Sequence, residues 1–148
     1  MVGKTAPIRQ RDRDRFEAIK TYCGCLPCLL LGHLNRHTTI EHVTCRGRRI
    51  GRGPEQHQNS IGLCSWHHFA VCDEGKHKHE MIGNFGPSLA LGRRPFEDWF
   101  GDELEVLVPI QNYVLKLFAD EPWPEYSLPV KIAYRVRERW IEIANARS

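Results

Sequence analysis

Two pairs of metal-binding residues, each with two residues between its members, constrain the fold of this chain more than any other feature. The first pair is Cys25 and Cys28, and the second is Cys64 and His67. This spacing lets both side chains of a tight turn face one ion, and two such pairs complete a tetrahedral site. We therefore predict a structural zinc ion that joins the two ends of the intervening segment. Unlinked buried thiols are the alternative interpretation.

Composition favours a metal site over disulfides. A chain of 148 residues can form one domain with its own core. No apolar run reaches membrane-spanning length, and the charged N-terminus lacks the apolar stretch of a signal peptide. We expect a soluble cytoplasmic protein whose six cysteines stay reduced. All of the cysteines and histidines precede Gly83, so we expect the chemistry in that part of the chain.

The segment between the two metal-binding pairs is predicted to contain two short strands. Thr38–Val43 is rich in β-branched residues, and a second strand is predicted near Ser60–Leu63. Ser65 is predicted to cap a helix over Trp66–Glu74, which Gly75 follows. The remaining segments are predicted to be irregular: a flexible arm over Met1–Arg15, a Cys-rich turn over Cys23–Leu31, and loops over Thr44–Pro54 and Gly75–Gly92.

The rest of the chain has helical patterns. Pro95 can start a short helix, PFEDWF, which Gly101 ends. Apolar residues recur with a helical period over Asp102–Phe118, where Pro109 must kink or break the helix. After a Pro-rich linker, a last helix is predicted over about Val130–Ala146.

Several polar residues lie beside the metal-binding pairs: Glu41 and His42 at the end of the first strand, Asn59 before the second, and His68 after His67. Successive helical residues point about 100° apart, so His68 can face the strands while His67 faces the zinc. Metal-assisted phosphodiester hydrolysis needs a cation that stabilises the phosphate and a base that deprotonates water. Glu41 and His68 can hold the cation, and His42 can be the base. Taken singly, each is equally well explained as an ordinary polar residue.

The order Cys-x-x-Cys, acid-His, Asn and Cys-x-x-His-His over Cys25–His68 resembles the HNH nuclease motif. The stretches IEHV, QNSIGLCSWHH and GPSLALGRRPFEDWFG, up to about Gly101, more narrowly resemble the phage recombination enhancement function (Ref) nucleases, which depend on RecA. The resemblance implies an α+β fold, with a small zinc-stapled ββα-metal (HNH) core and additional C-terminal helices. We accordingly predict a basic N-terminal arm over 1–20, a zinc-binding HNH nuclease domain over 21–101 and a C-terminal helical extension over 102–148.

The resemblance also implies an activity: metal-dependent hydrolysis of DNA phosphodiester bonds in a bacterial host cell, with Mg²⁺ or Mn²⁺ as the catalytic ion. In the family, the His of the acid-His pair is the general base, and the acid and the final His bind the ion. The Asn braces the loop that carries the base. These positions correspond to His42, Glu41, His68 and Asn59. The family's fourth zinc ligand is usually Cys rather than His67, and its acid is often Asp or His rather than Glu41.

One geometric condition follows from strand structure. Neighbouring strand residues point to opposite faces, so the strand must be distorted at its end for Glu41 and His42 to share a site.

Four arginines in one loop without acids are predicted to contact DNA: Arg46, Arg48, Arg49 and Arg52. Glycines in the same loop let the backbone approach a phosphate. A solubilising loop is the alternative, and the net charge of +3 permits nucleic-acid binding without arguing for it. Few groups here can read bases, so we expect weak sequence preference. RecA-coated DNA as the substrate is implied by the resemblance alone.

Other functions stay open at this point. One is an HNH endonuclease that does not need RecA, and another is a non-catalytic zinc-binding module that docks DNA or protein. A second metal site at Cys72, His77 and His79 is also open, although a solvated histidine-rich loop is favoured there.

Overall fold

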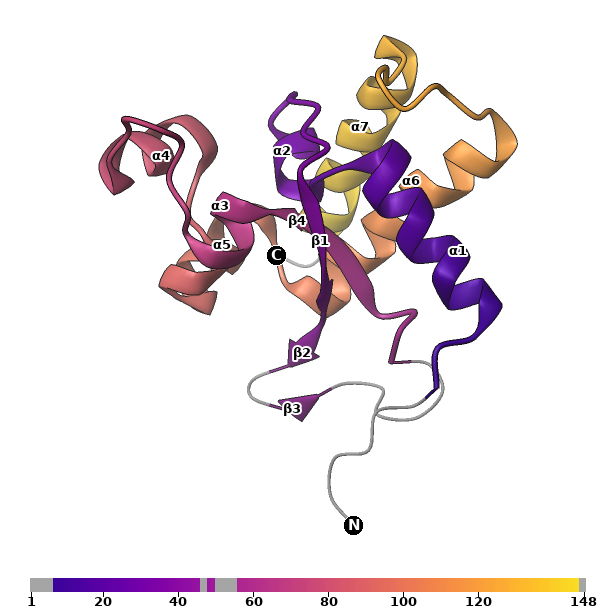
Figure 1. Ribbon diagram of the computed structural model, residues 1–148, viewed down its shortest axis with the longest axis horizontal. Helices are drawn as coiled ribbons and strands as arrows, with labels where there is room; N and C mark the ends of the chain where they lie inside the picture. Colours follow the sequence, from indigo (N-terminus) through magenta and orange to yellow (C-terminus); the bar gives the residue numbers. More distant parts are fainter. Residues whose placement is uncertain (1–6, 46–47, 50–55, 147–148) are drawn as a thin grey trace.

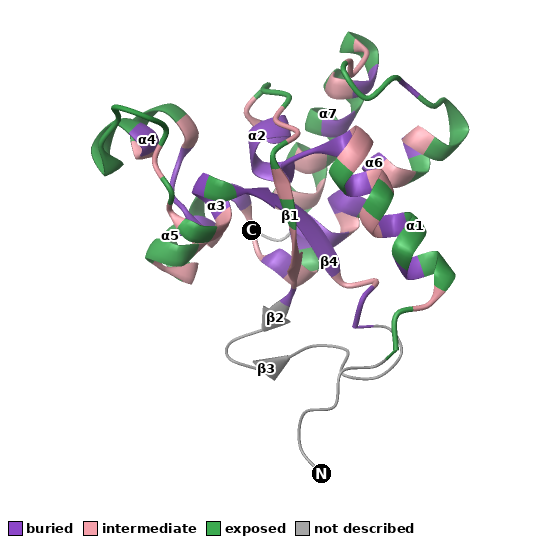
Figure 2. Ribbon diagram, viewed as in Figure 1, coloured by how far each residue is buried: buried purple, intermediate pink, exposed green. Residues whose placement is uncertain are grey.

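The centre of the fold is a pair of antiparallel strands (Figure 1). This computed structural model describes residues 7–45, 48–49 and 56–146. Strand β1 (Thr38–His42) pairs with β4 (Ser60–Cys64) in a regular register that runs from Thr38 opposite Cys64 to His42 opposite Ser60. Every residue of β4 is buried, whereas β1 is mostly half-buried (Figure 2). Both predicted strands are therefore confirmed.

A second, shorter strand pair lies in the segment predicted to be an irregular loop. Strands β2 (Thr44–Cys45) and β3 (Arg48–Arg49) pair with two rungs, Thr44 opposite Arg49 and Cys45 opposite Arg48. Two-residue strands contain too few residues to give a recognisable β pattern in a Gly- and Arg-rich sequence. Of the arginines predicted to contact DNA, Arg46 and Arg52 lie outside the described residues.

The N-terminal segment is a helix, so the predicted flexible arm over Met1–Arg15 is wrong from Gln10 onward. Helix α1 (Gln10–Ala18) continues into a π-helical turn, η1 (Ile19–Cys23). The many charges suggested a solvated arm, but two of them are buried. The Arg15 side chain donates to Ser60 Oγ at 2.9 Å and to Asn112 Oδ1 at 2.6 Å, which fixes α1 against β4 and a C-terminal helix.

The segments around the metal-binding residues are also more helical than predicted. Helix α2 (Leu26–Leu30) forms within the predicted Cys-rich turn. Helix α3 (Ser65–Phe69) is shorter than predicted and begins after Cys64, not Ser65, because the Cys64 side chain accepts the cap hydrogen bond from the His67 amide. It ends where Ala70 adopts a left-handed conformation, with φ of 58°. Helix α4 (Lys78–Phe85) and the 3-10 turn η2 (Leu89–Leu91) occupy the predicted loop.

The C-terminal helices agree with their sequence patterns. Helix α5 (Arg93–Phe100) ends at Gly101, as predicted. The π-helical turn η3 (Glu103–Leu107) leads into α6 (Val108–Asp120), and Pro109 lies in the first turn of α6, where a missing amide is tolerated. Helix α7 spans Val130–Ala146, which confirms the last predicted helix.

One hydrophobic core unites these parts. Ile61 and Leu63 of β4 pack with residues of α2, α5 and the C-terminal helices, among them Ile110 and Ile132. The buried amide of Gln111 accepts a hydrogen bond from the Gly62 backbone at 3.0 Å, so α6 also holds the strand directly. The fold is thus α+β, with β4 buried in the core and β1 half-buried beside it. No helix within the described ranges is long and apolar enough to cross a membrane.

Candidate functional site

Four side chains from two parts of the chain converge on one buried point: Cys25, Cys28, Cys64 and His67. Their ligand atoms all lie within 4.8 Å of one another. The Nδ1 atom of His67 lies 3.4 Å from Cys25 Sγ, 3.5 Å from Cys28 Sγ and 3.2 Å from Cys64 Sγ. The predicted cluster of metal-binding residues is therefore present, and it could hold a metal ion.

The spacing of these atoms fits a tetrahedral ion. Zinc–sulfur bonds of about 2.3 Å place two sulfurs about 3.8 Å apart in a tetrahedron. The Sγ atoms of Cys28 and Cys64 are 3.9 Å apart. Burial raises the pKa of the Cys25 thiol well above its ordinary value, so a thiolate at this position needs a cation beside it.

Neighbouring groups orient the cluster. The Nε2 atom of His67 lies 2.8 Å from the Phe85 carbonyl oxygen, to which it can donate, and this leaves Nδ1 to face the three sulfurs. The Asn35 side chain donates to Cys28 Sγ at 3.7 Å, and the His67 amide donates to Cys64 Sγ at 3.4 Å. Hydrogen bonds of this kind, to a ligand atom or to the other ring nitrogen of a ligating histidine, are typical around a metal site.

On one face of the strand pair, Glu41 and His68 are in direct contact. The Glu41 Oε2 atom lies 2.7 Å from His68 Nε2, and Thr39 Oγ1 lies 2.6 Å from His68 Nδ1. Burial raises the pKa of Glu41, although the nearby His68 and Arg93 act in the opposite direction. Two residues predicted to bind a catalytic ion, from β1 and α3, therefore meet at one place. Their side chains are 17% and 16% exposed, so solvent reaches both.

His42 has a different neighbourhood. Its Nε2 atom lies 3.0 Å from Nδ1 of His57, and Phe16 of α1 meets both imidazole rings edge-on. The strand register stays regular through His42, so the predicted distortion at this residue is not present. His42 and Glu41 consequently leave β1 on opposite faces, at its last two positions.

Three predicted residues, Asn59, Arg48 and Arg49, are placed here only by their backbone. Asn59 contributes its backbone, whose carbonyl accepts a hydrogen bond from the Val43 amide at 2.9 Å, immediately after His42. Arg48 and Arg49 form strand β3, close in sequence to the catalytic candidates.

Sequence reasoning missed two residues beside the predicted ones. His57 was an unassigned histidine in a polar stretch, and only the fold brings it to His42. Glu103 is 1% exposed, and within the described part of the chain neither of its carboxylate oxygens has a hydrogen-bond partner. An acid inside a helical pattern gives no sequence signal of burial, so Glu103 was not predictable.

Within the described residues, Cys72, His77 and His79 are not among the side chains that gather as a possible metal site. Cys72 is partly exposed, and His77 and His79 are exposed. This supports the solvated interpretation of that segment, although His79 lies in a helix rather than a loop.

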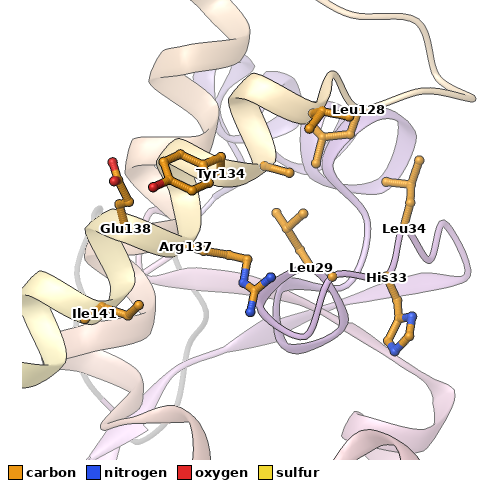
Figure 3. A pocket seen from close by; sticks show the side chains of 11 residues that line it. Leu29, His33, Leu34, Leu128, Tyr134, Arg137, Glu138 and Ile141 are labelled. Atoms are coloured by element: carbon orange, nitrogen blue, oxygen red, sulfur yellow. The ribbon is translucent and has the colours of Figure 1, made fainter.

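An open groove of about 750 Å³ lies between helix α2 with the turn after it and helix α7 (Figure 3). Its lining is largely apolar, with Leu29, Tyr134 and Ile141 among its residues. None of the predicted catalytic or metal-binding side chains lines it. We therefore place the candidate site at the strand pair, not at this groove.

Comparison with known proteins assigns the chain to a family. A family model described as "Recombination enhancement, RecA-dependent nuclease" matches residues 8–115, from the start of α1 into α6. The matched region contains both the Cys/His cluster and the Glu41–His68 contact, and it leaves out α7. No curated protein was found to match the sequence. Because the family model matches well over half of the length of this chain, the chain belongs to the recombination-enhancement, RecA-dependent nuclease family.

Proposed function

We propose that this protein is an HNH endonuclease that hydrolyses DNA phosphodiester bonds with a divalent cation held by Glu41 and His68. The observation that carries this proposal is the contact between these two side chains, a carboxylate and an imidazole at 2.7 Å. Oxygen and nitrogen ligands of this kind suit Mg²⁺ or Mn²⁺. This mechanism would account for the nuclease activity that the family description names.

The order of elements around this contact supports the HNH class. Two antiparallel strands, β1 and β4, are followed directly by helix α3, which is the order of a ββα-metal core. Glu41 comes from the first strand and His68 from the helix, at the positions that the motif requires. The Cys/His cluster, for which we propose zinc, joins α2 to the start of α3 and keeps these elements together.

We assign His42 as the general base. It takes the proton of the attacking water. It stands at the last rung of β1, where its side chain leaves the face opposite to that of Glu41. A divalent ion at Glu41 and His68 would supply Lewis-acid stabilisation of the charge that develops on the phosphate. Asn59, bonded through its carbonyl to the residue after His42, holds the strand end that carries the base.

The substrate proposal extends the family description. We propose that Arg46, Arg48, Arg49 and Arg52 contact the phosphate backbone, and that the enzyme acts on DNA together with RecA. We also propose that residues 21–101 carry the chemistry, between an N-terminal region and a C-terminal helical extension.

A plasmid-nicking assay tests this function. We expect nicking in Mg²⁺ or Mn²⁺, stimulated by RecA filaments, and its loss in Glu41→Gln protein. Exposed Glu80→Gln, on α4, is the matched control and should be unaffected. Cleavage without RecA at the full rate would favour a RecA-independent nuclease. Metal-independent DNA binding without any cleavage would favour a non-catalytic docking module.

A further inference from the structure

An exposed aromatic ring lies directly against the proposed site. Phe69 is the last residue of α3 and follows His68 in the sequence. The rings of His68 and Phe69 are stacked, with their centroids 3.9 Å apart and their planes 15° from parallel. Successive helical side chains ordinarily point about 100° apart, so the Phe69 ring is turned back over its neighbour. It therefore covers one face of a proposed metal ligand.

The Phe69 ring does not belong to the hydrophobic core. Phe69 is 57% exposed, so within the described residues the ring face turned away from His68 is open to solvent. A single exposed apolar side chain needs no explanation, but this one has exposed apolar neighbours. Val71 follows two residues later, and Leu91 belongs to η2, which packs against α3. The part of the surface beside the proposed site thus exposes several apolar groups.

The stacked rings are held in place from beneath. The Nε2 atom of His68 lies 2.7 Å from Glu41 Oε2, and its Nδ1 atom lies 2.6 Å from Thr39 Oγ1, so residues of β1 fix both ring nitrogens. A ligand that stacks on the outer face of Phe69 consequently meets a surface that is already ordered. Binding to an ordered surface costs less conformational entropy than binding to a mobile one.

An open aromatic face beside a site for phosphodiester hydrolysis suits one kind of ligand, a nucleobase. Each of the bases has a flat π face that stacks on an aromatic side chain, whatever the sequence. Within a duplex, the neighbouring base pairs cover both faces of every internal base. Only an unpaired base can therefore stack on Phe69.

We propose that Phe69 is a substrate-binding residue, which stacks with an unpaired base of the nucleotide beside the scissile phosphate. The inference rests on the proposed function, because that function places the scissile phosphate at Glu41 and His68. It adds a preference for DNA whose bases are unpaired at the cleavage site. Stacking contributes affinity without reading sequence, which agrees with the weak sequence preference expected here.

DNA binding by the full-length, zinc-loaded protein tests the proposal. It is measured without added Mg²⁺ or Mn²⁺, so that no strand is cut. Fluorescence anisotropy compares a single-stranded oligonucleotide with the corresponding duplex. Phe69→Leu keeps an apolar side chain but removes the π face, whereas Phe69→Trp keeps a π face. Tyr126→Leu, at an exposed aromatic residue between α6 and α7, is the matched control.

We expect Phe69→Leu to weaken binding to the single strand at least about fivefold and to leave binding to the duplex unchanged. Phe69→Trp and Tyr126→Leu should bind both as the parent does. A second measurement needs no variant. A single strand that carries 5-iodouracil, irradiated in complex with the parent protein, should cross-link to Phe69, and mass spectrometry of the peptides identifies the residue.

Other outcomes would overturn the inference. One is parental binding of the single strand by Phe69→Leu. Another is an equal loss for single strand and duplex, which would mean that Phe69 only supports His68. A nicking assay distinguishes these failures from failure of the proposed function. If Glu41→Gln stops nicking while Phe69→Leu binds the single strand normally, the inference is wrong and the proposed function stands. If Glu41→Gln nicks at the parental rate, the proposed catalytic site is wrong, whatever the binding data.

Discussion

The Nε2 atom of His42 lies 3.0 Å from the Nδ1 atom of His57, and His57 is 2% exposed. One of these nitrogens must donate and the other must accept, so each ring restricts the tautomer of the other. Phe16 packs edge-on against both rings and limits their rotation.

His57 is therefore predicted to position the proposed base. We expect His57→Ala to lower the kcat of nicking about 10²-fold, with little change in KM, because a misplaced base slows the chemical step more than binding. His57→Asn, whose amide can replace the lost hydrogen bond, should recover part of the rate. The exposed His77→Ala is the control. An equal loss in the Ala and Asn variants, with a lower Tm in both, would indicate a purely structural role.

Replacing His42 and replacing His68 are predicted to impair cleavage in different ways. His42→Ala should lose about 10²–10⁴-fold in cleavage rate while keeping its zinc, its DNA affinity and its Mn²⁺ affinity, because it removes only the base. His68→Ala should lose Mn²⁺ affinity, so high Mn²⁺ should restore part of its activity. Rates measured across a Mn²⁺ titration distinguish the two. Parental cleavage by His42→Ala across neutral pH would contradict the assignment of the base.

The arginines of β3 are predicted to bind phosphates without reading bases. Replacing Arg48 and Arg49 with Ala should weaken binding to all DNA sequences to a similar extent. The slope of log K against log salt should flatten by about one unit per lost phosphate contact. Binding measured by fluorescence anisotropy at several salt concentrations checks this. An unchanged slope would show that this segment only solubilises the protein.

Local patterns predicted the elements that depend on local chemistry. The β-branched run of β1 and the helix end at Gly101 depend on residues within one strand or turn, and both appear in the structure. At Pro109 the helical backbone continues, and this residue lies in the first turn of α6, directly after η3. The Cys/His cluster was predictable for a related reason. Ligand spacing is local within each pair, and one ion could join the two pairs.

The features that the sequence did not predict depend on tertiary contacts. Helix α1 has the charges of a solvated arm, but Arg15 is bound to Ser60 and Asn112, which lie far away in the sequence. The pairing of His42 with His57 and the burial of Glu103 likewise depend on how the strand pair packs against α1 and η3. No periodicity in the sequence encodes such contacts, so they could not be predicted from the sequence alone.

Acid is predicted to release α1 through Asp12. Burial alone would raise the pKa of Asp12, but hydrogen bonds from the Arg9 amide and the Gln58 side chain outweigh it and lower the pKa to about 2. A lowered pKa means that the native state favours the charged form. The stabilisation is therefore present above the ordinary Asp pKa and is lost as the pH falls from about 4 to about 2. Asp12→Asn should be less stable than the parent at pH 7, and this difference should shrink on acidification. Urea unfolding at pH 7 and pH 3 measures it, with the exposed Asp14→Asn as control.

Zinc is predicted to be part of the folded state and not of the catalytic step. The purified protein should contain one tightly bound zinc ion per chain by elemental analysis. Cys25→Ser should unfold it, because the four ligands join α2 to the start of α3 and metal binding is coupled to folding. Cys72→Ser is the matched control: Cys72 is partly exposed and lies outside the cluster, so the variant should keep both zinc and fold. Chelation should abolish the circular dichroism signal of the helices and nicking together, and Mg²⁺ alone should restore neither. A metal-free protein that stays fully folded would contradict the zinc assignment, whatever the outcome for Glu41 and His68.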